Sequence, residues 1–257
     1  MYQLRRKLFS QNFLYDRKLV SKLVRSSSID KKDLVLEIGP GKGIITEALI
    51  RQAQHVLAVE IDSHLYAHLQ EKLVWARNLT LYRDNILNFK LPVIPYKVFA
   101  NIPFAIEGKI LRYLIDAQNP PNDCYLVVMK ELAYRLSAPY KENWFSLAHK
   151  PWFNFSITHQ FGRSDFRPIP NVDAVLFRFN LKDNYLLRWG EKASYQKFLR
   201  TCFGQGLPVW QNMKNAYGRK LTEYLLMSLG INKNQRPSDL SLEKWIIMYR
   251  KFISSRI

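Results

Sequence analysis

The sequence predicts an α/β protein with a doubly wound, mostly parallel sheet, followed by a small all-helical C-terminal domain. Two observations carry this prediction. Between residues 34 and 137, short apolar runs alternate with stretches of helical periodicity, which is the pattern of parallel strands joined by crossover helices. After about residue 184 only helical periodicity remains. We therefore expect two domains, spanning residues 1–182 and 183–257.

The first elements are predicted in order from the N-terminus. Residues 1–28 are basic and predict an arm followed by a helix at about 16–26. The apolar run at 34–38 stops at glycines, as a buried strand does before a tight turn. Further strands are expected at 55–60, 79–82, 97–100 and 125–129, and helices at 44–53, 63–74, 107–117 and 130–137, with Ser63 as a candidate N-cap.

The pattern changes beyond residue 150. Two β-rich runs, 155–161 and 173–181, flank a loop that contains Pro168 and Pro170. We interpret them as antiparallel edge strands, which brings the expected sheet to seven strands. Helical periodicity then covers about 191–203, 211–229 and 241–255.

The net charge of +18, from 39 Lys and Arg against 21 Asp and Glu, produces a field that attracts polyanions. Residues 182–256 hold 14 Lys and Arg against 5 Asp and Glu, so the charge density is highest there. We expect a nucleic acid as partner and no membrane, because no apolar run approaches the roughly 18 residues of a span.

Cysteine and histidine usage is sparse. The two cysteines, Cys124 and Cys202, lie far apart, which fits a reducing cytosol and offers neither a disulfide framework nor a zinc site. His64 and His68 are four residues apart, but no third metal ligand accompanies them. We expect a cytoplasmic monomer that holds no metal.

A glycine-rich turn follows the first strand, in the segment Glu37-Ile38-Gly39-Pro40-Gly41-Lys42-Gly43. Glycines allow a tight turn and close approach of a ligand at the carboxyl end of a sheet. Glu60 ends the second strand, where an acid can accept hydrogen bonds from both hydroxyls of an adenosine ribose. The alternative is a plain glycine turn with a surface glutamate.

Two details favour S-adenosylmethionine over a nicotinamide dinucleotide. The spacing is Glu-x-Gly-x-Gly-x-Gly and not Gly-x-Gly-x-x-Gly. Asp84 follows the third strand, where it could accept the adenine amine of the cofactor, although it could also merely cap its loop.

The strongest signal is Asn101-Ile102-Pro103-Phe104 at the end of the fourth strand. Methylation of an aromatic amine requires two acceptors that take its two N–H groups, so that the nitrogen lone pair turns toward the methyl donor. The Asn101 side-chain oxygen is one acceptor. Pro103 keeps Ile102 extended, which presents the Ile102 carbonyl as the other. Phe104 offers a face for stacking on the base, and catalysis would be positioning plus electrostatics.

Five segments together resemble the Erm/KsgA family of ribosomal RNA adenine dimethyltransferases, and they run in family order over about 70% of the chain. These are Ser10-Gln11-Asn12-Phe13-Leu14, Glu37 to Gly43, Val59-Glu60-Ile61-Asp62, Asn101 to Phe104, and Phe166-Arg167-Pro168-Ile169-Pro170-Asn171-Val172-Asp173.

The resemblance implies a Rossmann-like class I S-adenosylmethionine methyltransferase domain and a helical C-terminal domain. It implies that Phe166 is a second base-stacking aromatic, although Phe166 could equally be a core residue that anchors the proline loop. The residues it implies around the cofactor are Gln11, Asn12, Leu14, Gly39, Gly41, Glu60, Ile61, Asp84, Asn85 and Asn101.

The RNA is expected along a basic groove formed by the N-terminal arm and the cleft between the domains, with the target adenine unstacked into the pocket. Candidate contacts are Arg5, Arg6, Lys7, Lys109, Arg112, Lys130 and Arg135.

Two branches of the family compete for the substrate. The Asn-Ile-Pro form and the short C-terminal part resemble the Erm branch, which acts on 23S ribosomal RNA and confers resistance to macrolides, lincosamides and streptogramin B. The KsgA branch acts on 16S ribosomal RNA and more often has Leu and Tyr where this chain has Ile102 and Phe104. We expect the Erm branch. A binding-only RNA or transcription factor, a nicotinamide dehydrogenase and a DNA adenine methyltransferase are the alternatives outside it.

Overall fold

A computed structural model describes residues 12–137, 142–204 and 206–255 of the chain. It contains two compact units. The first comprises the described residues up to Ala133 together with Ser156–Leu181, and the second comprises those from Tyr134 to Phe155 and from Lys182 onward. No helix within the described ranges is long and apolar enough to cross a membrane.

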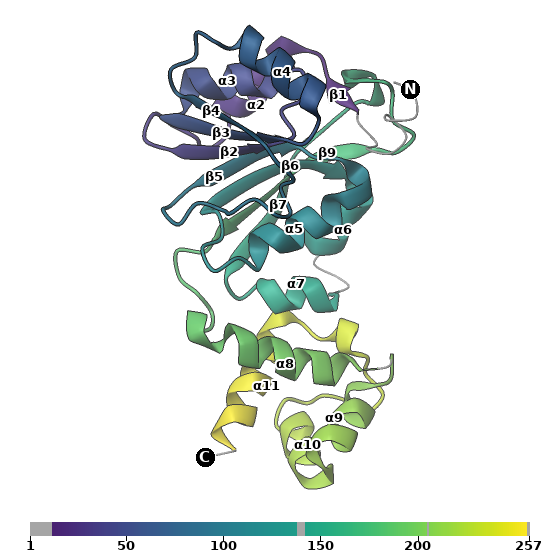
Figure 1. Cartoon of the computed structure of the whole chain (residues 1–257). Coiled ribbons are helices and arrows are strands. Elements are labelled where there is room, and N and C mark those ends of the chain that lie inside the picture. The colour runs from purple at the N-terminus through teal and green to yellow at the C-terminus, as the bar shows by residue number, and fades with distance from the viewer. Residues whose placement is uncertain (1–11, 138–141, 205, 256–257) are drawn as a thin grey trace. The chain divides into compact units, whose positions relative to one another are not determined.

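The first unit is built on the expected seven-stranded sheet (Figure 1). The pairs β2–β3, β3–β4, β2–β5 and β5–β6 are parallel, and β9 runs antiparallel to β6. The strands lie in the order β4 (Leu79–Arg83), β3 (His55–Glu60), β2 (Leu34–Ile38), β5 (Lys97–Asn101), β6 (Asp123–Met129), β9 (Ala174–Leu181) and β7 (Phe153–Gln160).

The parallel strands are largely apolar between their ends because helices cover both faces of the sheet. Figure 1 shows α2 (Arg17–Arg25), α3 (Ile44–Gln52) and α4 (Ser63–Lys72) on one face and α5 (Glu107–Ile115) on the other. Right-handed crossovers bring the carboxyl ends of β2 to β5 to one edge. The glycine turn, Glu60, Asp84 and Asn101 therefore gather there.

Several boundaries differ from the sequence prediction for identifiable reasons. Helix α4 is capped by Asp62 and not by Ser63, because the Asp62 carboxylate accepts the N–H groups of His64 and Leu65. The helix expected at 211–229 is two helices, α9 (Val209–Tyr217) and α10 (Arg219–Met227), which meet at Gly218 with φ of 81°.

A short strand pair that the sequence did not indicate joins the N-terminal segment to the proline loop. Strand β1 (Phe13–Leu14) runs antiparallel to β8 (Phe166–Arg167). Two-residue strands lie below the length at which an alternating pattern can be recognised.

The second unit contains α7 (Trp144–His149), α8 (Lys192–Phe203), α9, α10 and α11 (Leu242–Ser254), together with the end of α6 (Lys130–Ser137). Its core is aromatic, with Tyr195, Phe198 and Trp245 at most 1% exposed.

The second unit resumes at Lys182, one residue before the predicted start of the C-terminal domain at 183, and it also contains residues 134–155, which the sequence predicts within the first domain. The reason for the difference is Trp152. It is fully buried, donates its indole N–H to the carbonyl of Leu187 at 3.0 Å, and packs edge-on against Tyr195. These contacts bind the segment before β7 to the C-terminal helices.

Candidate active site

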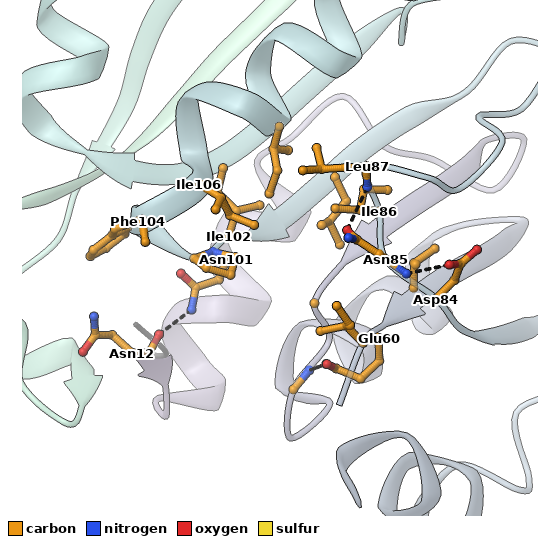
Figure 2. Close-up of a pocket in the computed structure, with 18 of the residues that line it drawn as sticks. Asn12, Glu60, Asp84, Asn85, Ile86, Leu87, Asn101, Ile102, Phe104 and Ile106 are labelled. Carbon is orange, nitrogen blue, oxygen red and sulfur yellow. Dashed lines mark hydrogen bonds between the residues drawn. The ribbon is translucent and has the colours of Figure 1, made fainter. Parts of the chain in front are cut away.

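A cavity of about 260 Å³ lies at the carboxyl edge of the parallel strands in the first unit. Its walls are mostly apolar, and its polar atoms come from the motifs that the sequence indicated. Figure 2 shows Asn12, Asn101 and Phe104 on one side of it and Glu60, Asp84 and Asn85 on the other. The lining residues are Asn12, Phe13, Ile38, Gly39, Gly41, Val59, Glu60, Ile61, Asp84, Asn85, Ile86, Leu87, Asn101, Ile102, Pro103, Phe104, Ala105, Ile106 and Ile110.

The glycine turn needs its glycines for two different reasons. Gly39 and Gly41 have φ values of 65° and 58°, in the left-handed region that other residues avoid. At Gly41 there is also no room, because a Cβ would lie 2.6 Å from the ring of Phe13. Phe13 thus packs against the glycine turn, and the backbone of the turn forms part of the cavity wall.

Glu60 holds this turn in place. One carboxylate oxygen accepts the N–H of Gly41 at 3.0 Å, and the other accepts the N–H of Asp62 at 2.9 Å. The residue is only 2% exposed, and burial raises the pKa of Glu60. Each carboxylate oxygen can accept a further hydrogen bond, so Glu60 can hold the loop and still receive hydroxyl donors.

The turn after β4 supplies the other polar wall. Asp84 accepts the N–H of Asn85 at 2.7 Å, and the Asn85 side chain accepts the N–H of Leu87 at 3.1 Å (Figure 2). Asp84 therefore caps its own loop and also lines the cavity, and its contact with the cofactor adenine stays a prediction. Ile61 is 48% exposed at the rim.

Asn101 is oriented by a single strong contact. Its amide nitrogen donates to the main-chain carbonyl of Asn12 at 2.7 Å (Figure 2). Because the nitrogen is committed to this bond, the side-chain oxygen is the end left to accept from a ligand. Pro103 has φ of −62° and ψ of 122°, and the Ile102 carbonyl accepts no hydrogen bond within the part of the chain that the structure describes. Two acceptors therefore stand next to each other at the end of β5.

The comparisons with known proteins decide the family. The model of the family described as ribosomal RNA adenine dimethylase matches residues 2–254. The chain belongs to this family. It is therefore an S-adenosylmethionine-dependent ribosomal RNA adenine methyltransferase.

Relatives of this chain match nearly its whole length. The ribosomal RNA small subunit methyltransferase A of Ureaplasma urealyticum serovar 10 is 30% identical over 95% of this chain and 90% of its own. The protein of the same name from Lactococcus lactis is 30% identical over 93% and 87%.

Among solved structures, the 23S rRNA methyltransferase ErmE superposes with a TM-score of 0.82, at 25% identity over 93% of this chain and 99% of that one. A dimethyladenosine transferase from Plasmodium falciparum has the same TM-score at 21% identity, over 95% and 98%. The latter likeness supports the fold alone.

Two residues expected at the catalytic site do not line the cavity. Phe166 is fully buried, packs at 5.4 Å between ring centroids against Phe161, and does not line the cavity. Strand β8 places this ring in the core, which is the position given by the alternative interpretation, and stacking on a base stays a prediction. Leu14 is 5% exposed in the same cluster and does not line the cavity, so its contact with the cofactor stays a prediction.

Several predicted contacts cannot be placed at the cavity. Gln11, Arg5, Arg6 and Lys7 lie outside the described residues. Lys109 and Arg112 are exposed on α5 of the first unit, Lys130 begins α6, and Arg135 belongs to the second unit. None of these four lines the cavity, so their role in RNA binding stays a prediction.

The cavity also includes residues that the sequence reasoning missed. Ile38 and Val59 lie at the carboxyl ends of β2 and β3, and this position was the available signal for them. Phe13 belongs to β1, and Ile86 and Leu87 lie in the loop after β4.

Glu37 lies behind the glycine turn and is 1% exposed. Neither of its carboxylate oxygens has a hydrogen-bond partner within the described residues. Burial raises the pKa of Glu37 to about 8, so this side chain carries a proton over much of the neutral range.

Proposed function

We propose that the chain transfers methyl groups to the exocyclic amine of an adenine in ribosomal RNA, with Asn101 and the Ile102 carbonyl as the two acceptors that orient the amine. The observation that carries this proposal is the hydrogen bond from the Asn101 amide nitrogen to Asn12, at 2.7 Å. It leaves the side-chain oxygen as acceptor beside the main-chain carbonyl of Ile102.

The chemistry follows from the electronic structure of the amine. Its lone pair is delocalised into the adenine ring and is a poor nucleophile until the nitrogen moves toward tetrahedral geometry. Two acceptors at fixed positions favour that geometry, and their effect is strongest in a cavity from which water is excluded. S-adenosylmethionine supplies an electrophilic methyl group. Phe104, which lines the cavity at 9% exposure, would contact the face of the base.

The cavity has groups that fit this cofactor. We assign Glu60 to the ribose hydroxyls, because its two carboxylate oxygens keep acceptor capacity beyond their bonds to Gly41 and Asp62. Asp84 is assigned to the adenine amine, and the aliphatic side chains Ile86 and Ile102 would enclose the adenine ring. Asn12 and Gly39 lie at the end of the cavity nearest Asn101, where we place the methionine part.

The first candidate substrate is an adenine of the small-subunit ribosomal RNA. Relatives named for that subunit are 30% identical to this chain over 93–95% of its length. This favours the 16S alternative over the 23S substrate that we expected from the sequence.

The second candidate is 23S ribosomal RNA. The resemblance to ErmE at 25% identity and TM-score 0.82, together with the Asn-Ile-Pro-Phe form of the motif, favours it. Methylation of this RNA would reduce binding of macrolides, lincosamides and streptogramin B.

One experiment separates the two candidates. The protein is incubated with labelled S-adenosylmethionine and, in separate reactions, with purified 16S and 23S ribosomal RNA, and the modified adenine is mapped by reverse transcription. Label in 16S RNA alone supports the first candidate, and label in 23S RNA alone supports the second. Label in duplex DNA but in neither RNA would overturn the proposal.

A further inference from the structure

A second hollow lies in the first unit at the end of α3 opposite the glycine turn. Its volume is about 430 Å³. Helix α3 starts at the glycine turn and ends at Gln52, so at about 1.5 Å per residue the hollow is roughly 12 Å from the cofactor cavity. It is lined by Ser21, Arg25, Ile29, Asp30, Lys31, Ala48, Arg51 and Gln52.

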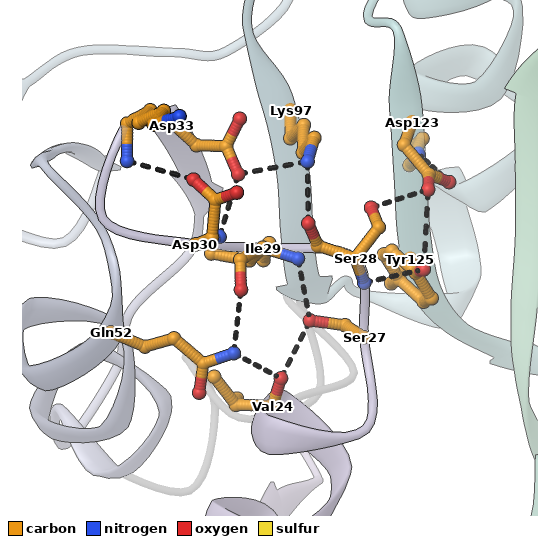
Figure 3. Close-up of polar contacts among 12 residues, drawn as sticks. Val24, Ser27, Ser28, Ile29, Asp30, Asp33, Gln52, Lys97, Asp123 and Tyr125 are labelled. Carbon is orange, nitrogen blue, oxygen red and sulfur yellow. Dashed lines mark hydrogen bonds and ion pairs between the residues drawn. The ribbon is translucent and has the colours of Figure 1, made fainter.

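The loop beneath the hollow is fixed by hydrogen bonds, as Figure 3 shows. The Gln52 side chain donates to the carbonyls of Val24 at 3.1 Å and Ile29 at 2.6 Å. The N–H of Asp30 donates to Asp33 at 2.7 Å, and the Asp33 carboxylate also pairs with Lys97 at 2.8 Å. The backbone that carries these lining residues is therefore ordered before any ligand arrives.

The hollow carries more positive than negative charge. The guanidinium groups of Arg25 and Arg51 are exposed and have no ion-pair or hydrogen-bond partner in the described part of the chain. Lys31 donates to the main-chain carbonyl of Arg51 at 2.5 Å, which keeps its ammonium group at the rim. The opposing carboxylate, Asp30, accepts the N–H of Lys32 at 2.8 Å. Three cations thus face one anion.

Helix α2 connects this hollow to the catalytic edge. The helix begins five residues after Asn12, whose carbonyl holds Asn101. Its exposed face consists of basic residues and contains no acid: Arg17, Lys18, Lys22 and Arg25. Arg17 pairs with Glu47, whereas the other three are exposed and form no ion pair with another described residue. A line of cations therefore runs from the site of chemistry to the hollow.

We propose that the hollow binds phosphates of the RNA backbone and that α2 is the track along which that backbone reaches the catalytic cavity. This inference rests on the proposed function, because it takes RNA as the substrate. Planar guanidinium groups match phosphate oxygens in pairs. Contacts to phosphate position a nucleic acid without reading its sequence.

The hollow therefore anchors the RNA at a distance from the modified base. The anchor accounts for exposed cations at an edge of the sheet where no cofactor atom reaches. It also lies apart from the basic positions on α5 that the sequence indicated, since α2 and α3 cover the opposite face of the sheet (Figure 1).

The test removes the two guanidinium charges with the double variant Arg25→Gln/Arg51→Gln. The probe is whichever of 16S or 23S RNA the wild-type protein methylates. We expect RNA affinity at about 0.15 M salt to fall roughly tenfold and the slope of log affinity against log salt to become shallower by about 1.5. Cofactor affinity, followed by thermal shift with S-adenosylmethionine, is expected to be unchanged.

Two comparison variants show whether a loss of RNA affinity comes from the positive charges at positions 25 and 51. Arg25→Lys/Arg51→Lys retains both charges and should keep most of the salt slope. Lys90→Gln/Lys220→Gln removes two exposed lysines outside the hollow and should have a much smaller effect. Equal losses in this pair and in the Gln pair would overturn the proposal, as would unchanged RNA affinity in the Gln pair. If the wild type methylates no RNA, the proposed function itself fails.

A second measurement does not depend on loss of affinity. Cys124 and Cys202 are both fully buried, so a cysteine introduced as Arg51→Cys can be labelled selectively with a photocrosslinker. We expect crosslinks to the RNA, several nucleotides from the methylated adenine. Absence of RNA crosslinks from position 51, under conditions where methylation proceeds, would contradict the track.

Discussion

The two edges of the sheet in the first unit use polar groups in opposite ways. At the amino ends of the strands, polar side chains bind one another. Asp123 accepts from Ser28 at 2.6 Å and from Tyr125 at 3.2 Å (Figure 3), and it also accepts from Arg178 at 2.6 Å. At the carboxyl ends, Asn101 and Glu60 use only part of their capacity on the protein. The difference shows that polar groups whose hydrogen bonds are satisfied within the protein stabilise the fold, whereas groups with acceptor capacity left over are available to a ligand.

The largest effect is expected at the catalytic edge. Asn101→Ala should lower the rate of methyl transfer on the order of 100-fold, because it removes one positioned acceptor of the amine. Single-turnover kinetics with saturating RNA and cofactor measure this.

A matched control for Asn101 is Asn78→Ala. The Asn78 side chain also donates to main-chain carbonyls, those of Ile50 and Ala53, but it lies outside the cavity. Its loss should lower stability and leave the rate nearly unchanged. Near wild-type turnover by Asn101→Ala with cofactor bound would show that the amine is oriented by other groups.

At the opposite edge, Asp123→Asn should cost stability and spare the chemistry. The carboxylate is 4% exposed and is bound by Arg178 through two of its nitrogens. Removal of its charge is expected to lower the free energy of unfolding by about 2 kcal/mol. Denaturant unfolding measures this, and thermal shift with cofactor checks that binding persists. Weakened cofactor binding at unchanged stability would contradict the view that the amino edge stabilises the fold while the carboxyl edge binds the ligand.

Most of the catalytic edge could be predicted from the sequence because its parts are local. The glycine turn, Glu60 and Asn101 to Phe104 each follow a strand directly, and parallel strands bring such positions together. The hydrogen bond between Asn12 and Asn101, 89 residues apart, depends on strand β1, which is too short to leave a pattern. The same limit explains Phe166, because only the pairing of β8 with β1 reveals that its ring faces the core.

The opposite edge was hardly visible in the sequence. Its groups come from the loop before β2, from the end of α3 and from the starts of β5 and β6, and no motif links them. Residues 134–155 were misassigned for a similar reason, since the burial of Trp152 against Leu187 and Tyr195 is a tertiary contact. Contacts between distant segments decide both cases, and periodicity reports only on near neighbours.

A smaller effect is expected at Glu60, which anchors the glycine turn and is assigned to the ribose hydroxyls of the cofactor. In Glu60→Gln an amide nitrogen must face the N–H of Gly41 or Asp62, so the glycine turn loses one of its two anchors. We expect the dissociation constant for S-adenosylmethionine to rise about tenfold, as measured by calorimetry. Glu47→Gln is the control, because Glu47 lies on the same loop–helix unit but pairs with Arg17 and Lys72 outside the cavity. Equal losses in both variants would mean that α3 as a whole was disturbed.

The smallest effect concerns Glu37, which is buried at the catalytic edge without using its acceptors at all. Burial raises the pKa of Glu37 from 4.5 to about 8, so between these values the folded state holds a proton that the unfolded state releases. Stability from this group is therefore complete below about pH 4.5 and declines as the pH rises toward 8. Over one pH unit, from 6 to 7, the decline is at most about 1.4 kcal/mol.

In Glu37→Gln, which cannot ionise, this part of the pH dependence should disappear. Relative to the wild type, the variant should therefore be more stable at pH 7 than at pH 6. Denaturant unfolding of both proteins at the two pH values measures the difference. Parallel curves would mean that Glu37 is ionised in the folded protein and that this edge holds a charge which a ligand's cation could meet.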